Sequence, residues 1–94
     1  MIVYVSIGNS DDKLTQRQWA QFVTRVRADI VNAASQVHGQ WYSLPDCMWQ
    51  NACWCLEFDS DADAKRAREA AITIRRQYQQ DSVAWAVVPV TDFI

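Results

Sequence analysis

Hydrophobic residues follow two different periods along the chain, and the changes of period mark out its elements. Apolar residues alternate over Ile2–Ile7 and stop at Gly8-Asn9, which predicts a strand that ends in a turn. From Trp19 they recur every three or four positions, which predicts an amphipathic helix running to about Ser35. The apolar stripe of this helix consists of Trp19, Phe22, Val23, Val26, Ile30 and Ala33.

The start of this first helix carries two local signals. Thr15 followed by Gln18 is a capping box, in which each residue satisfies a backbone N–H of the other. Leu14 and Trp19 occupy the two positions of a hydrophobic staple. Both signals predict that the helix begins directly after Thr15.

The second half of the chain repeats the pattern with two more strands before a helix. Strands are predicted over Val37–Ser43, Asn51–Phe58 and Ser82–Val90, and Leu44–Gln50 is a loop that contains Pro45-Asp46. Ser60, with Asp63 three residues later, predicts the start of a second helix. The inner stripe of that helix consists of Ala64, Ala67, Ala71, Ile74 and Tyr78.

The order of these elements is β-α-β-β-α-β, the ferredoxin-like pattern. We therefore predict one α+β domain over residues 1–94, a two-layer sandwich whose two helices cover one face of a four-stranded antiparallel sheet. The predicted core side chains of the sheet are Val3, Val5, Ile7, Trp41, Trp54, Leu56 and Phe58.

Composition narrows the class of protein. Half of the 94 residues are hydrophobic, which excludes a disordered chain, and no apolar run reaches the ~18 residues of a membrane span. The net charge of −2 argues against general nucleic-acid binding. The N-terminus lacks the basic start of a secretory signal, and the three cysteines (Cys47, Cys53 and Cys55) suit reduced thiols. A cytoplasmic location is expected.

Alternating strand directions bring three connections to one end of the sandwich, beside the start of the first helix. We expect this end to bind a small ligand through hydrogen-bonding side chains, with Trp49 as a stacking surface. The alternative is that these residues only shape the turns and cap the helix. The predicted ligand-binding residues are Asn9, Ser10, Asp11, Asp12, Lys13, Trp49, Gln50 and Asn51.

The sheet face that the helices leave uncovered predicts self-association. Its strands contain Glu57 as their one charged residue, whereas a solvated sheet face normally alternates with charged side chains. A homodimer or higher homo-oligomer would cover it. Its predicted residues are Tyr4, His38, Gln40, Tyr42, Cys53, Cys55 and Glu57, with Ile2 and either Val83, Trp85 and Val87 or Ala84, Ala86 and Val88.

Sequence motifs give little support for metal, cofactor or catalytic chemistry. His38, Cys53, Cys55 and Glu57 could share one sheet face as zinc ligands, but Cys-Trp-Cys is shorter than the usual spacing. The acidic run that opens at Asp59 lacks the Gly and Glu of a calcium loop. We predict no cofactor, no metal and no catalytic residue, and an enzyme that uses His38 as acid or base is kept as an alternative.

Four segments carry a resemblance: Ile7–Gln16, His38–Ser43, Trp49–Cys55 and Asp81–Ala86. Together they resemble a set of small uncharacterised proteins encoded by phages and mobile elements of actinobacteria. The resemblance covers most of the chain and implies an accessory phage context, in which such proteins modulate or counter host processes. It assigns no site residue.

The sequence therefore predicts a non-enzymatic, homo-oligomeric protein that binds a small, nucleotide-like ligand, with Lys13 and the first helix start facing its negative charge. The alternative is a module that inhibits or recruits a host protein. It would act through the open sheet face or through the arginines of the second helix, which include Arg75 and Arg76.

Overall fold

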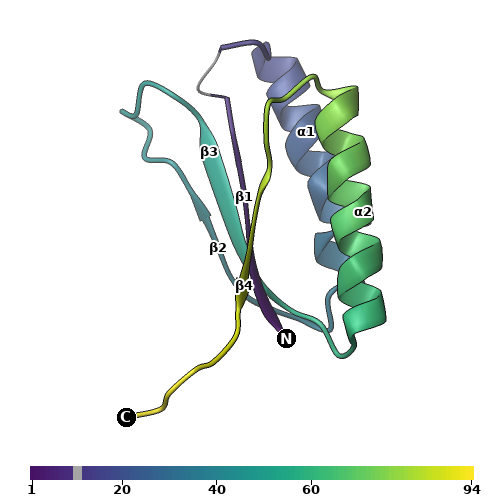
Figure 1. Ribbon diagram of the computed structural model, residues 1–94. Coiled ribbons are helices and arrows are strands. Elements are labelled where there is room, and N and C mark those ends of the chain that lie inside the picture. The colour runs from purple at the N-terminus through teal and green to yellow at the C-terminus, as the bar shows by residue number, and fades with distance from the viewer. Residues whose placement is uncertain (10–11) are drawn as a thin grey trace.

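The computed structural model describes residues 1–9 and 12–94 and has the predicted ferredoxin-like α+β fold. Four antiparallel strands form one sheet in the order β2-β3-β1-β4, and the two helices lie side by side on one of its faces (Figure 1). The elements are β1 (Ile2–Gly8), α1 (Gln16–Asp29), a 3-10 turn (Val31–Ala33), β2 (Gln36–Tyr42), β3 (Asn51–Glu57), α2 (Asp61–Gln77) and β4 (Ala84–Val88).

Both helices begin at the residues that the sequence predicts. Thr15 Oγ1 accepts from the backbone N–H of Gln18, and Gln18 Oε1 accepts from the N–H of Thr15, so the capping box is complete. Ser60 Oγ accepts from the N–H of Asp63 at the start of α2. The local sequence therefore sets both starting points.

Helix α1 ends at Asp29, so its predicted end near Ser35 is wrong. Ile30 and Val31 are both buried, at 0% and 9% exposure. Successive side chains of an α-helix point about 100° apart, and the tighter 3-10 turn at Val31–Ala33 brings both into the core while turning the chain toward β2. Ala33, predicted on the buried stripe, is exposed as a result.

Helix α2 ends in a Schellman motif. The N–H of Gln80 donates to the carbonyl of Arg75 over 3.0 Å, and the N–H of Gln79 donates to that of Arg76 over 3.1 Å. Gln79 has a φ of 54°, the left-handed conformation that this motif requires. The motif fixes where the chain leaves the helix for β4.

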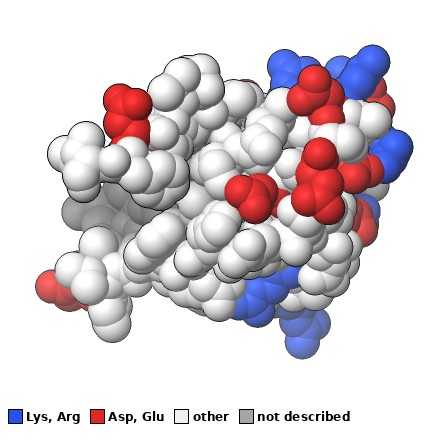
Figure 2. Space-filling model, turned by 90° about the horizontal axis from the view of Figure 1, so that it is seen from below, with Lys and Arg blue, Asp and Glu red and all other residues white. Residues whose placement is uncertain are grey.

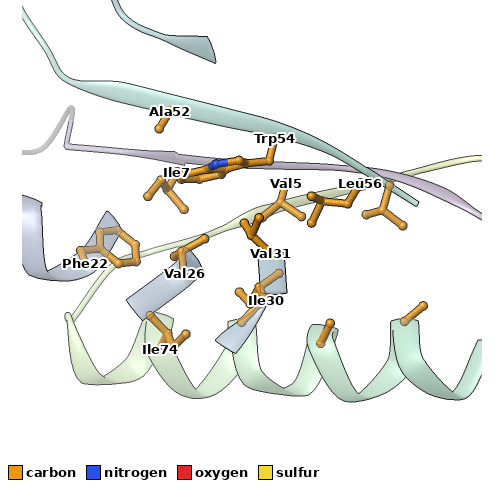
Figure 3. Close-up of a cluster of buried hydrophobic side chains, with 14 of the residues drawn as sticks. Val5, Ile7, Phe22, Val26, Ile30, Val31, Ala52, Trp54, Leu56 and Ile74 are labelled. Atoms are coloured by element: carbon orange, nitrogen blue, oxygen red, sulfur yellow. The ribbon is translucent and has the colours of Figure 1, made fainter. Parts of the chain in front are cut away.

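The core lies between the sheet and the helices, with Trp54 at its centre (Figure 3). Trp54 is the largest fully buried side chain, and Val5, Phe22 and Ile30 are also 0% exposed. Ala64, Ala67 and Ala71 give α2 an inner stripe of small buried side chains. The predicted core of the sheet is confirmed except at Trp41.

Strand β2 contains a β-bulge that reverses the predicted faces of its second half. Val37 is opposite Leu56, but Gly39 is opposite Cys55, so one extra residue enters between them. Gln40 and Tyr42 then lie opposite Trp54 and Ala52, on the helix side of the sheet. Placing Gln40 and Tyr42 on the open face, and Trp41 in the core, is therefore wrong.

The face without helices, called the open face below, can be followed in rows across the four strands. Trp41, Cys53, Ser6 and Ala84 form one row, and Gly39, Cys55, Tyr4 and Ala86 form the next. Glu57, Ile2 and Val88 form the row nearest the N-terminus of β1. Of the two alternatives for β4, the register selects Ala84, Ala86 and Val88.

Candidate functional site

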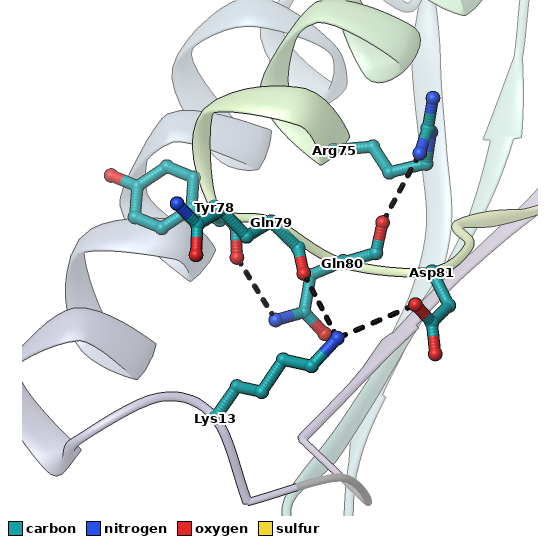
Figure 4. Close-up of polar contacts among 6 residues, drawn as sticks. All are labelled: Lys13, Arg75, Tyr78, Gln79, Gln80 and Asp81. Atoms are coloured by element: carbon teal, nitrogen blue, oxygen red, sulfur yellow. Dashed lines mark hydrogen bonds and ion pairs between the residues drawn. The ribbon is translucent and has the colours of Figure 1, made fainter.

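The three predicted connections meet at one end of the sandwich. The N–H of Asn9 donates to the carbonyl of Gln50 over 2.9 Å, and Gly8 is opposite Asn51 in the sheet. Lys13 Nζ lies 3.4 Å from Asp81 Oδ1 and 3.4 Å from the carbonyl of Gln79 (Figure 4). The β1–α1, β2–β3 and α2–β4 connections therefore form one polar end, which confirms that part of the prediction.

Asn9 organises this end from the inside. It is only 4% exposed, its Nδ2 donates to the carbonyl of Leu14 and its Oδ1 accepts from the N–H of Leu14. Both hydrogen-bonding groups of the amide thus bond to Leu14 within the β1–α1 connection, and Nδ2 also lies 3.4 Å from Gln50 Oε1 on the β2–β3 loop. Asn9 holds the connection closed and is not positioned to contact a ligand.

Gln50 and Asn51 both make hydrogen bonds within this end of the sandwich, and Asn51 is also exposed. Gln50 Nε2 donates to Gln16 Oε1 over 2.8 Å, which fastens the β2–β3 loop to the start of α1. Asn51 Nδ2 donates to the carbonyl of Trp49 over 3.3 Å. Asn51 Oδ1 lies over Gly8, where an added Cβ would come within 2.6 Å of it, so a side chain at position 8 would displace it.

The remaining predicted ligand-binding residues lie in different places. Asp12 is exposed, and its φ of 56° gives it a turn conformation. Ser10 and Asp11 lie outside the described residues. Lys13 lines a hollow on the helix side with Gln18, Gln77 and Gln79. Trp49 is 39% exposed on the β2–β3 loop.

Two adjoining hollows open where β1 ends on the open face. A polar hollow of about 350 Å³ is lined by Ser6, Ile7, Gly8, Asn51, Gln80, Asp81, Ser82 and Ala84. A less polar hollow of about 210 Å³ is lined by Ser6, Ile7, Trp41, Tyr42, Ser43, Asn51, Ala52 and Cys53. Ser6, Ile7 and Asn51 line both, so the two hollows adjoin along these residues.

Trp41 supplies a flat aromatic wall beside the second hollow. Its side chain is 54% exposed, and its ring lies against Gly39, where an added Cβ would come within 2.6 Å of the indole. The glycine therefore allows the indole to lie down on the sheet. Trp49, the predicted stacking surface, lines neither hollow.

The polar hollow offers more acceptors than donors. Asp81 is the charged side chain among its lining residues, and these include no Lys or Arg. Gln80 Nε2 already donates to the carbonyl of Tyr78 over 3.1 Å (Figure 4). The amide oxygen of Asn51 and the carboxylate of Asp81 are acceptors, and the hydroxyls of Ser6 and Ser82 can act in either sense.

Helix α2 and β4 enclose a third hollow, of about 240 Å³, on the side of the molecule. Arg68 and Arg75 line it together with Ser82 and Trp85, and Asp81 is the acidic side chain among its lining residues. Arg75 Nη1 also donates to the carbonyl of Gln80 over 3.2 Å, which holds its guanidinium near the α2–β4 connection (Figure 4).

The open face retains His38, Cys53, Cys55 and Glu57 of the predicted set. His38 Nε2 lies 3.7 Å from Glu57 Oε1, and both side chains are 38% exposed. Tyr4 is opposite Cys55, and the pKa of its phenol is raised, chiefly by hydrogen bonding to Cys55. No group of three His, Cys, Asp or Glu that could hold a metal is found among the described residues.

Ser6, Ser82 and Trp41 line the hollows but are not among the residues that the sequence predicts at this end, whereas Gln80 is predicted there without a ligand-binding role. The α2–β4 connection had been placed at this end of the sandwich, so position along the chain was a usable signal for Gln80 and Ser82. Trp41 was assigned to the core because the bulge that turns it outward leaves no mark on the residue alternation.

Lysines and arginines gather on the helix side of the molecule, and the sheet side shows none in the view of Figure 2. Within the described part of the chain, no helix combines the length and apolarity that crossing a membrane requires. A comparison of the chain with protein-family models, curated proteins and solved structures finds no match in any of the three.

Proposed function

We propose that the protein is a non-enzymatic binding protein for a small planar ligand, held across the two adjoining hollows where β1 ends. The observation that carries the proposal is that a polar hollow and a hollow walled by Trp41 share Ser6, Ile7 and Asn51. Ligand sites typically combine an apolar or aromatic wall with a few convergent polar groups. A volume of about 350 Å³ is at the small end of such sites.

The chemistry of the lining selects the ligand class. Because Asn51 and Asp81 present acceptors, the ligand should donate N–H groups, as an amino-bearing nucleobase or its nucleoside does. Its planar ring would stack on the Trp41 indole. A phosphate would meet the Asp81 carboxylate, so the nucleoside should bind more tightly than its 5′-monophosphate. Lys13 would reduce this preference for the nucleoside, because its ammonium group lies 3.4 Å from the Asp81 carboxylate and offsets part of its charge.

Isothermal titration with nucleobases, nucleosides and their 5′-monophosphates tests the proposal. We expect a nucleoside to release or absorb heat, and Trp41→Ala to weaken its binding by about tenfold or more. Trp49→Ala is the matched control, because it removes an exposed indole that lines neither hollow. Absence of heat with the whole panel, or weakening by Trp49→Ala alone, would reject the site.

A second candidate function is recognition of an acidic host-protein segment by α2. Its support is the hollow of about 240 Å³ in which Arg68 and Arg75 stand beside the half-buried Trp85. Arginine binds carboxylates with two parallel hydrogen bonds, and Trp85 would add apolar contact. An acidic peptide that binds the native protein and is lost with Arg68→Glu, but kept with the exposed Arg76→Glu, would favour this function.

We also propose an accessory role in a phage, because the sequence resembles small proteins encoded by phages and mobile elements of actinobacteria. It fits either candidate, since a protein that sequesters a nucleoside or binds a host protein could alter a host process. Expression in an actinobacterial host, with Trp41→Ala and Arg68→Glu compared, would separate the two candidates: loss of the host effect with one variant only assigns it to that surface.

A further inference from the structure

The open face also carries an apolar surface on β1 and β4, away from the two hollows. Ile2 and Tyr4 of β1 lie opposite Val88 and Ala86 of β4 on this face. We call these four residues the β1–β4 patch. Tyr4 is 39% exposed and Ala86 is also exposed, while Ile2 and Val88 are half-buried. None of the four is charged, which is unusual for the solvated face of an antiparallel sheet.

Residues 89–94 continue from β4 and add further unburied apolar side chains. Val90 is 72% exposed, Phe93 is 95% exposed and Ile94 is fully exposed at 119%. The segment, called the tail below, leaves the body of the molecule beyond the end of β4 (Figure 1). The patch and the tail are continuous along the chain, so one partner could cover both.

The total exposed area is larger than a compact monomer of this size requires. The chain exposes 6246 Å², whereas the size scaling of monomeric proteins gives roughly 5,500 Å² for this mass. The excess of about 700 Å² is close to the ~800 Å² that each partner buries in a stable protein interface. The radius of gyration is also larger than expected, at 13.4 Å against roughly 12.4 Å.

We propose that a second copy of this chain covers the β1–β4 patch, and that the tail of each copy packs across the other. A second copy fits this surface better than an acidic or basic partner does. The four patch residues have no charged side chain to pair with such a partner, and the charges nearest to them are Glu57, beside Ile2 in the same row, and Asp92 in the tail. A two-fold arrangement uses the same patch on both copies and closes on itself.

The mass of the full chain in solution tests this proposal without any ligand. Sedimentation equilibrium should give twice the chain mass of 10.8 kDa. Ala86→Arg should shift the mass to that of one chain, raising the dissociation constant by about a hundredfold or more, because an arginine would be buried without a partner. Circular dichroism of this variant should be unchanged, since Ala86 is exposed.

Val87→Arg is the matched control, since Val87 is the next residue of β4, is 49% exposed and points to the helix side opposite Val3. It should leave the dimer intact. Replacing Phe93 and Ile94 by Ser should weaken the dimer without changing the fold. A single-chain mass for the native protein at every concentration up to its solubility limit would overturn the proposal. So would a dimer that Ala86→Arg leaves unchanged.

Discussion

Trp54 fills the centre of the core and carries a buried group without a partner. It is 0% exposed, and its Nε1 is the one buried side-chain nitrogen or oxygen, among the described residues, that lacks a hydrogen bond. An unsatisfied buried donor destabilises the folded state by about 1–3 kcal/mol. The volume of the indole therefore stabilises the fold while its N–H opposes it.

Two substitutions should separate these contributions. Trp54→Ala should lower the free energy of unfolding by about 3–5 kcal/mol, because it leaves a cavity. Trp54→Phe should cost about 1 kcal/mol or less, since it removes the unsatisfied N–H together with part of the volume. Urea unfolding measures both. A loss well above ~1 kcal/mol for Trp54→Phe would show that the lost volume outweighs the gain from removing the N–H.

Tyr4 titrates under the influence of the two cysteines on its own sheet face. The pKa of its phenol lies above the ordinary value of 10.0. Hydrogen bonding to Cys55 contributes most to raising this pKa, followed by the electrostatic interaction with Cys55, by desolvation and by the electrostatic interaction with Cys53. All of these favour the neutral phenol over the phenolate.

Removing the main cause should return Tyr4 toward its ordinary titration. We expect Cys55→Ala to lower the pKa of the Tyr4 phenol, measured by tyrosinate absorbance, with Tyr4→Phe identifying its signal among the three tyrosines. Because the folded-state pKa is raised, its stabilising contribution is present below pH ~10 and is lost as the pH rises through the folded value. An unchanged titration in Cys55→Ala would contradict the assigned cause.

At the scale of elements, Asn9 holds the connection between β1 and α1. Its amide both donates to and accepts from the backbone of Leu14, which is 7% exposed. Asn9→Ala should lower the free energy of unfolding by about 1–3 kcal/mol, because two buried backbone groups lose their partners. Gln50→Ala, which leaves both bonds to Leu14 in place, should cost well under that. Thermal unfolding compares the two variants.

The end of α2 offers a stabilising change. Gln79 adopts a φ of 54°, which is unfavourable for a residue with a Cβ but open to glycine. Gln79→Gly should raise the free energy of unfolding by roughly 0.5–1 kcal/mol. Gln77→Gly, two residues earlier and still helical, should lower it by up to about 1 kcal/mol. Chemical denaturation of both variants distinguishes a conformational effect from a general effect of glycine.

At the scale of the whole molecule, self-association should appear in thermal unfolding. If the folded state is a dimer, dilution favours the unfolded chains, so the unfolding midpoint should rise with protein concentration. Ala86→Arg should abolish this dependence, and Val87→Arg should keep it. If the unfolding midpoint of the native protein does not change over a roughly hundredfold range of protein concentration, the dimer is contradicted.

The topology and most of the core follow from local residues. The capping box at Thr15 and Gln18, the cap at Ser60 and the spacing of apolar residues suffice for the element order, because each acts within one or two helical turns. The same alternation selects Val3, Val5 and Ile7 as core residues of β1, since a central strand covered by helices must bury one face. Three connections at one end follow from that topology alone.

The tertiary structure decided what the residue pattern leaves open, above all in β2. This strand lies at the sheet edge with most of its side chains exposed, so no buried face fixes its register, and a bulge between Val37 and Gly39 reverses the faces of Gln40, Trp41 and Tyr42. The hollow that Trp41 lines depends on that bulge. The end of α1 likewise depends on the burial of Ile30 and Val31 in the core, which local periodicity does not reveal. The inward position of Asn9 combines local bonds to Leu14 with a backbone bond to the distant Gln50.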